Sequence, residues 1–175
     1  MVTLRCTQKL LRRLGAPTKV ETFPPTTVLG DWYATLVHTR PHQLVVCMNE
    51  RTLLVVLVLA RESSSLRTRF REAVTAQLRR LGVPPAAIEA EARAMSELAL
   101  GPTASRSLLG CLREAVFALS LELERPEFSS LTDVEDWFSE YIYSTTQYHY
   151  PRKLALELFD AAGAISGGAT AARIH

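Results

Sequence analysis

Three side chains with complementary chemistry stand together at Asn49, Glu50 and Arg51, in the stretch "NER". An amide, a carboxylate and a guanidinium at one turn could bind a phosphate or polarise a substrate, because a guanidinium fork matches phosphate oxygens. The same residue types are also common at ordinary turns, where Asn bonds to the backbone and Glu pairs with Arg at the surface. The sequence favours this structural role and leaves the turn as a candidate ligand-binding site.

A second polar pair, Arg106 and Ser107, begins a stretch that is otherwise apolar. The N–H groups of a first helical turn point outward and favour an anion, so this pair is also a candidate for ligand binding. Gly110 costs about 1 kcal/mol relative to alanine inside a helix, which predicts that another backbone approaches closely there. We expect the Arg106 guanidinium to face a polar cluster, with a structural role if the cluster holds an acid and a ligand-binding role if it lines a cavity.

Glu50, Arg51 and Arg106 are the groups that a small hydrolase or transferase would use on a phosphorylated substrate. No motif supports such an enzyme, because the sequence has no Walker loop, no dinucleotide glycine fingerprint, no H-E-x-x-H and no G-x-S-x-G. We therefore predict no catalytic residue and no cofactor. The sequence alone does not decide whether the protein is an enzyme.

The histidines and cysteines do not predict a metal site. His38 and His42 straddle a turn that contains Pro41, and Cys47 is the one further ligand nearby. Zinc sites usually need three or four protein ligands, so we expect exposed turn histidines and no metal. The three cysteines are odd in number and lie in apolar stretches, which predicts buried, reduced thiols and a cytoplasmic location.

Charge is divided between the two halves of the chain. Residues 1–80 carry 13 Lys and Arg against 5 Asp and Glu, a net charge of +8, and residues 81–175 carry 7 against 13, a net charge of −6. A basic face for an anionic partner would explain this division, and so would two halves that attract each other within one domain. The candidate nucleic-acid-binding residues are Arg12, Arg13, Arg67, Arg71, Arg79 and Arg80.

Four stretches have the pattern of β-strands. Residues 2–7 alternate between apolar and polar, and 31–39, 44–50 and 52–61 are apolar runs separated by turns. The short connections between the last three predict antiparallel hairpins. The run 52–61 is apolar on both faces, so we expect a central strand that is covered on both sides.

Helical periodicity follows over residues 66–81, from 85, over about 106–123, from 132 and over 150–159. The helix over 106–123 is apolar most of the way round, which predicts that it is the buried central helix.

Four segments of the chain resemble an uncharacterised bacterial family, a domain of unknown function. They are "LRCTQKLLRRLG", "TTVLGDWYATLV", "NERTLLVVLVLAR" and "RSLLGCLREAVFAL". The resemblance covers residues 2 to about 122. It implies a bacterial protein with one compact domain, and it implies no activity, cofactor or catalytic residue.

The sequence thus predicts a single α+β domain over residues 1–160, with a disordered tail over 161–175. We expect an antiparallel sheet of three to four strands packed against four to five helices. No apolar run reaches the ~18–20 residues that span a bilayer, so no membrane partner is expected. The oligomeric state stays open.

The leading functional hypothesis is a non-enzymatic interaction protein of the bacterial cytoplasm that binds a protein or nucleic-acid partner. The alternative is the hydrolase or transferase acting on a phosphorylated substrate. The surface distinguishes them: a deep pocket with Arg51 or Arg106 favours the enzyme, a continuous basic face favours nucleic acid, and a shallow apolar patch favours a protein partner.

Overall fold

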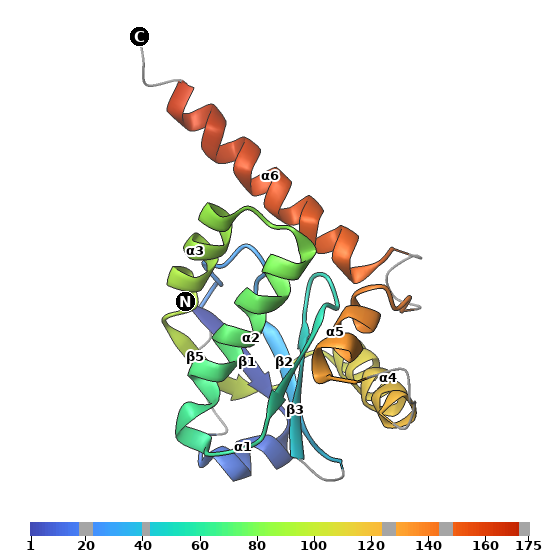
Figure 1. The fold of residues 1–175 in the computed structure, drawn as a ribbon. Coiled ribbons are helices and arrows are strands. Elements are labelled where there is room, and N and C mark those ends of the chain that lie inside the picture. The colour runs from blue at the N-terminus through green and yellow to red at the C-terminus, as the bar shows by residue number, and fades with distance from the viewer. Residues whose placement is uncertain (18–22, 40–42, 124–128, 144–148, 172–175) are drawn as a thin grey trace.

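The computed structural model describes residues 1–17, 23–39, 43–123, 129–143 and 149–171, with side chains up to residue 165. The described chain forms five strands and six α-helices (Figure 1). They are β1 (Val2–Cys6), α1 (Gln8–Leu14), β2 (Trp32–His38), β3 (Gln43–Asn49), β4 (Val55–Leu59), the 3-10 turn η1 (Ser63–Ser65), α2 (Leu66–Leu81), α3 (Pro85–Ala94), β5 (Leu98–Pro102), α4 (Arg106–Glu122), α5 (Leu131–Ser139) and α6 (Pro151–Ala171).

The strands form one mixed sheet in the order β4-β3-β2-β1-β5. The predicted hairpins are confirmed, because β2 pairs with β3 and β3 with β4 in antiparallel fashion. In contrast, β1 runs parallel to both β2 and β5. The α+β class is therefore correct, but the expected antiparallel sheet of three to four strands with four to five helices is wrong in its details. Helix α1 lies between β1 and β2 in the chain, and such a crossover is what a parallel pair requires.

Strand β5 was not expected, because "LALGP" is short and ends in Gly and Pro, which are typical of a break. The strand lies at the edge of the sheet, where proline is tolerated. Its formation depends on pairing with β1, from Val2 opposite Leu98 to Cys6 opposite Pro102. These partners are almost a hundred residues apart, so local pattern cannot reveal them.

Strand β4 lies at the opposite edge, so the prediction that it is central is wrong. Its coverage on both sides is confirmed: α2 packs on one face and α5 on the other. Helices therefore explain its apolar sequence on both faces.

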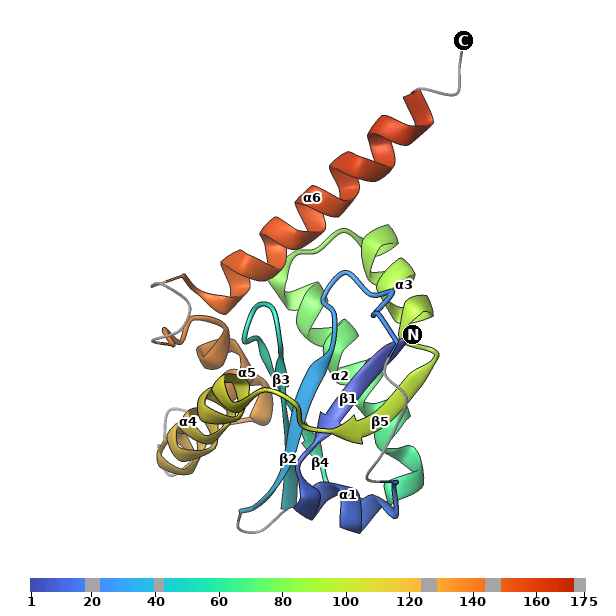
Figure 2. The same cartoon turned by 180° about the vertical axis from the view of Figure 1, so that it is seen from behind.

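Helices cover both faces of the sheet (Figures 1 and 2). One core joins α1, α2, α3 and the first half of α6 to one face, with the ring of Phe70 edge-on to Trp32 at 5.4 Å. The other core joins α4 and α5 to the opposite face through Tyr33, Met48 and Phe138.

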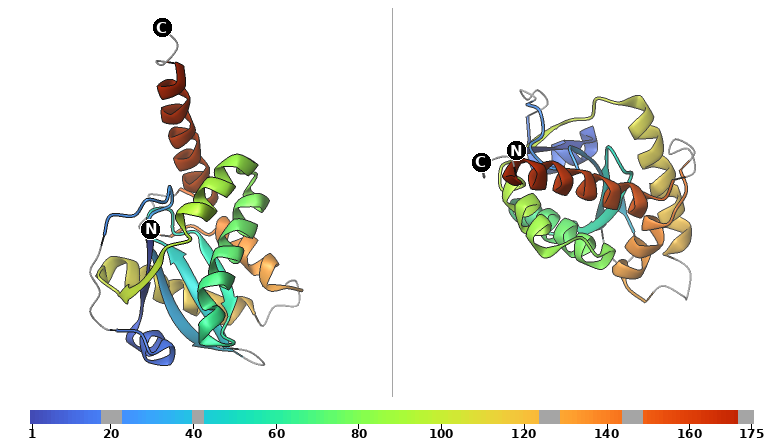
Figure 3. Two further views of the ribbon diagram at one scale, coloured as in Figure 1. Left: turned by 90° about the vertical axis from the view of Figure 1, so that its left-hand side faces the viewer. Right: turned by 90° about the horizontal axis from the view of Figure 1, so that it is seen from above.

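Helix α6 begins beside α5 and extends beyond the rest of the molecule (Figure 3). The predicted domain boundary at residue 160 lies inside this helix, and disorder over 161–175 stays a prediction. Among the described residues, no helix has the length and apolar character needed to cross a membrane.

Candidate functional site

The turn at Asn49 forms hydrogen bonds to the loop that directly precedes β2. The Asn49 side chain is fully buried, and its Nδ2 donates to the carbonyls of Leu29 at 2.9 Å and Asp31 at 3.3 Å. Its Oδ1 accepts from the N–H groups of Arg51 at 3.1 Å and Thr52 at 3.0 Å, and from the Thr52 hydroxyl at 2.9 Å. Both functional groups of this amide are therefore used in structural contacts.

Glu50 and Arg51 hold the same loop from the outside. Glu50 Oε1 accepts from the N–H of Asp31 at 3.0 Å, and Arg51 Nη1 donates to the carbonyl of Val28 at 2.9 Å. Gly30 lies directly beneath them with a φ of +77°. A Cβ at Gly30 would lie 2.8 Å from Arg51 Nε and 2.9 Å from Glu50 Oε1, so only glycine lets these side chains come so close.

Two buried carboxylates, Glu91 on α3 and Asp31 in the loop itself, tie this loop to other elements. The Glu91 carboxylate accepts from the N–H groups of Val28 at 2.7 Å and Leu29 at 3.1 Å, while burial raises the pKa of Glu91. Asp31 Oδ2 accepts from Nη2 of Arg5 at 2.8 Å and from its Nε at 3.1 Å. The geometry around the Asn49–Arg51 turn therefore favours a structural role, and ligand binding by these three residues stays a prediction.

Arg106 and Ser107 begin α4, and both are exposed. The helix is capped by Ser105, whose Oγ accepts from the N–H of Leu108 at 3.3 Å. Within the described part of the chain, the Arg106 guanidinium makes no hydrogen bond or ion pair, so the expectation that it faces a polar cluster is wrong. Gly110 is also exposed, and a Cβ added there would meet no described atom within 4 Å. The close backbone approach expected at Gly110 is therefore not found among the described residues.

The six candidate nucleic-acid-binding arginines lie on α1 and α2 but do not share one role. Arg80 Nη2 bonds to Glu135 Oε2 at 2.5 Å and its Nε to Asp136 Oδ1 at 2.8 Å, which ties α2 to α5. Arg13 donates to the carbonyl of Ala60 at 3.5 Å. The remaining members are exposed or half-buried: Arg12, Arg67, Arg71 and Arg79.

Cys6 and Cys47 are poor nucleophiles. Cys6, Cys47 and Cys111 are all buried, and none of them forms a disulfide bond. Burial raises the pKa of Cys6 to about 12 and the pKa of Cys47 well above its ordinary value, so both stay protonated at neutral pH. Among the described residues, no three His, Cys, Asp or Glu side chains are placed to hold a metal ion. His38 is exposed at the end of β2, and His42 lies outside the described residues.

A cleft of about 340 Å³ opens between α4 and the sheet. Its floor on α4 is apolar, formed by Leu109, Leu112 and Val116. Three basic residues border it from three different elements: Lys9 from α1, His38 from β2 and Arg113 from α4. Between them lie the hydroxyls of Thr7 and Thr35, 3.0 Å apart. We call this feature the α4 cleft.

Next to the α4 cleft, helix α4 carries large apolar side chains on its outer surface. Phe117 is 68% exposed and Leu121 is 51% exposed. They follow Arg113 at intervals of four residues, so the three share one side of the helix. We call Arg113, Phe117 and Leu121 the α4 face. The prediction that α4 is a buried central helix is therefore wrong, although Cys111, Leu112, Ala115 and Leu119 are buried on its other side.

The sequence did not indicate this site, because its parts come from three separate segments. The one available signal was the end of each strand: Thr7 directly follows β1 and His38 ends β2. Since β1 and β2 are parallel, their carboxyl ends meet at the same edge of the sheet. Such edges commonly bind ligands in mixed α/β structures, but the antiparallel sheet expected from the sequence would not bring these residues together.

Comparison with curated proteins and with solved structures finds no match. A family model does match, over residues 3–154, and this match extends past residue 122, where the resemblance seen in the sequence ends. The chain therefore belongs to the family described as Domain of unknown function (DUF6933).

Proposed function

We propose that this protein is a non-enzymatic interaction protein and that it binds a protein partner through the α4 face. The observation that carries the proposal is the exposure of the Phe117 side chain, which is 68% accessible to solvent. Burying a Phe or Leu side chain against a partner contributes about 1.5–3 kcal/mol. Aromatic and arginine side chains are also the commonest anchors of protein interfaces, and Phe117 lies one turn from Arg113 on α4.

The α4 cleft supports the same proposal, because it extends the apolar surface of α4. Val116 and Leu112 line the cleft, and Arg113 belongs both to the cleft and to the α4 face. A shallow apolar surface with a basic border suits a partner segment that carries apolar and acidic side chains. The cleft and the face together would bury more area than either alone.

The alternative functions have less support. Neither the α4 cleft nor the larger pocket beside β5 includes Glu50, Arg51 or Arg106, the groups proposed for an enzyme acting on a phosphorylated substrate. For a nucleic-acid partner, Arg80 is committed to Glu135 and Asp136. These ion pairs join the basic first half of the chain to its acidic second half, so part of the charge division is explained without an anionic partner.

We place this function in the bacterial cytoplasm. Three buried cysteines without a disulfide bond support a reducing compartment. The bacterial source is inferred from the family resemblance in the sequence.

A photo-crosslinking amino acid at position 117 tests the proposal in the full chain, expressed in its source cells. We expect crosslinks to a small, reproducible set of proteins. Position 165 is the matched control, because Ile165 is 75% exposed on α6 and lies outside the α4 face.

Two results would contradict the proposal. One is that position 117 gives no crosslinked protein. The other is that positions 117 and 165 give the same set, which would mean that exposure alone decides capture. Crosslinks from position 117 that disappear when Leu121 is changed to Ser support the α4 face as the binding surface.

A further inference from the structure

One edge of the sheet is closed by charged side chains. Strand β4 pairs with β3 so that Met48 lies opposite Val55 and Leu44 opposite Leu59. In this register the N–H and C=O groups of Leu57 and Leu59 point away from β3, toward the outside of the sheet. Glu135 Oε1 accepts from the Leu57 N–H at 2.6 Å, and the Arg69 guanidinium donates to the carbonyl of Leu59. Charged groups on an edge strand prevent the addition of another strand.

Among the residues that the structure describes, none protects the opposite edge, β5, in this way. The N–H of Val2 donates to the carbonyl of Glu97, and this register turns the backbone groups of Ala99 and Gly101 toward β1. The N–H and C=O groups of Leu98 and Leu100 therefore point outward. In the described part of the chain, no side chain or backbone group bonds to them. An unpaired edge of this kind is a template for an extended segment.

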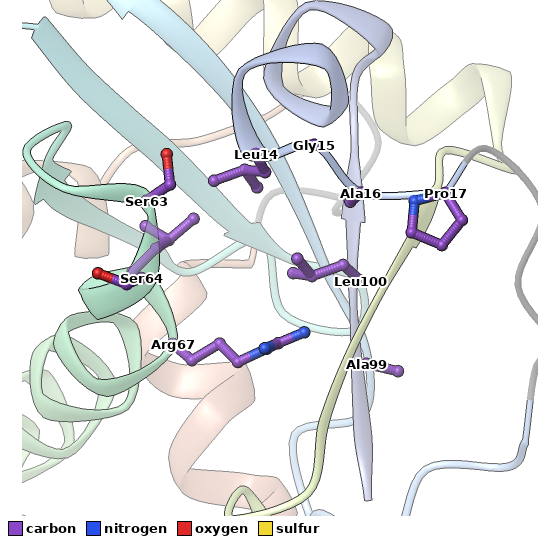
Figure 4. Close-up of a pocket in the computed structure, with 10 residues that line it drawn as sticks. Leu14, Gly15, Ala16, Pro17, Ser63, Ser64, Arg67, Ala99 and Leu100 are labelled. Atoms are coloured by element: carbon purple, nitrogen blue, oxygen red, sulfur yellow. The ribbon is translucent and has the colours of Figure 1, made fainter.

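A groove of about 450 Å³ runs beside this edge (Figure 4). Leu100 on β5, Leu14 on α1 and Leu66 on α2 give it an apolar lining, and Ser63 and Ser64 add hydroxyls. Arg67 extends from α2 into the groove, and among the described residues that line the groove it is the one with an ionisable side chain. We call it the β5 groove.

We propose that the β5 groove binds an extended, acidic polypeptide segment, which adds to the sheet as a strand beside β5. The outward groups of Leu98 and Leu100 supply backbone hydrogen bonds, alternate side chains of the segment enter the groove, and Arg67 pairs with an acidic side chain. A second copy of this chain fits less well, because a two-fold pairing of β5 strands would bring two Arg67 guanidinium groups to the same edge. This site goes beyond the proposed function, because no residue of the α4 face takes part.

The test uses a library of random short peptides displayed for selection on the full chain. Selected peptides are synthesised with amidated C-termini, so that acidic side chains are their only carboxylates. We expect these peptides to share acidic residues among apolar ones. Their affinity is measured for the wild type, for Arg67→Glu and for the matched control Arg79→Glu, which makes the same charge change near the other end of α2. We expect Arg67→Glu to weaken binding at least about tenfold and Arg79→Glu to leave it unchanged.

Amide hydrogen exchange followed by NMR locates the bound peptide on the strand. In the free protein, the amides of Leu98 and Leu100 should exchange quickly and those of Ala99 and Gly101 slowly. Adding the peptide should slow exchange at Leu98 and Leu100 specifically. The inference is overturned if no peptide is selected, if exchange at Leu98 and Leu100 is unchanged by the peptide, or if Arg67→Glu binds as the wild type does. Protection that rises with protein concentration alone would show a second copy on β5 and would also overturn it.

Discussion

Asn49 shows how a single buried amide can organise a distant loop. Its side chain lies between the turn after β3 and the loop before β2, and its five hydrogen bonds satisfy groups on both. A buried donor or acceptor without a partner costs about 1–3 kcal/mol of stability. The Asn49 amide therefore stabilises the fold mainly because it gives several buried backbone groups a hydrogen-bond partner. Arg51, its neighbour, makes its contact to Val28 at the exposed surface.

Asn49→Ala should therefore lower the free energy of unfolding by about 2–4 kcal/mol, because the carbonyl of Leu29 and the N–H of Thr52 lose their partners. Arg51→Ala should lower it by about 1 kcal/mol or less, since water can replace an exposed hydrogen bond. Urea unfolding of both variants measures the difference. Equal losses for the two variants would mean that the Asn49 bonds contribute little.

The position of this turn could be predicted from the sequence, whereas its role could not. Asn, Glu and Arg between two apolar runs mark a turn by local chemistry alone. The groups that they bind, at Val28, Leu29 and Asp31, lie about twenty residues earlier in a segment without periodicity. For the same reason the sequence made Arg51 and Arg106 look alike, although Arg51 donates to a carbonyl and Arg106 makes no hydrogen bond to any described residue.

Among the elements, β4 and α5 depend on each other through Glu135. This carboxylate is buried, accepts from the Leu57 N–H and pairs with Arg80, while burial raises its pKa. Its neighbour Asp136 also pairs with Arg80, but its side chain is 49% exposed. The two acids thus offer a comparison between a buried and an exposed contact to one guanidinium.

Glu135→Ala should lower the free energy of unfolding by about 2–4 kcal/mol, because it leaves the Leu57 N–H without an acceptor and removes the buried partner of Arg80. Asp136→Ala should cost about 1 kcal/mol or less, as exposed ion pairs do. Thermal or denaturant unfolding gives both values. A larger loss of unfolding free energy for Asp136→Ala than for Glu135→Ala would show that the buried carboxylate does not hold β4 to α5.

Helix α2 provides a second prediction at this scale. Its basic residues should not bind duplex DNA more tightly than about 1 µM at moderate salt, because Arg80 is neutralised by α5 and Glu72 interrupts the others. A titration with labelled duplex at two salt concentrations is the measurement. Sub-micromolar binding with a steep dependence on salt would contradict it and would favour the nucleic-acid partner.

Elements with strong local patterns could be predicted, and those that depend on distant partners could not. The hairpins of β2, β3 and β4 follow from short connections between apolar runs, and α2 follows from its periodicity and Gly82. Strand β5 exists only through its pairing with β1. Helix α4 looked buried because Phe117 and Leu121 are apolar, and sequence pattern does not distinguish a residue that faces the core from one that faces a partner.

Across the whole molecule, the charge division and the exposed apolar residues have separate explanations. Arg80 joins the basic first half of the chain to Glu135 and Asp136 of the acidic second half, within one domain. Phe117 and Leu121 of the α4 face, in contrast, are largely exposed on the surface of the described chain. We propose that another protein covers the α4 face.

The most direct test is the affinity of the crosslinked partner for four forms of the chain, measured by titration calorimetry: wild type, Phe117→Ser, Arg51→Ala and Arg106→Ala. Phe117→Ser should raise Kd by about 10–100-fold, the loss expected when about 1.5–3 kcal/mol of apolar burial is removed, with an unchanged unfolding midpoint. Arg51→Ala and Arg106→Ala should bind within about twofold of the wild type, because neither belongs to the α4 face. Wild-type affinity for Phe117→Ser, together with lost binding in Arg51→Ala or Arg106→Ala, would contradict the account.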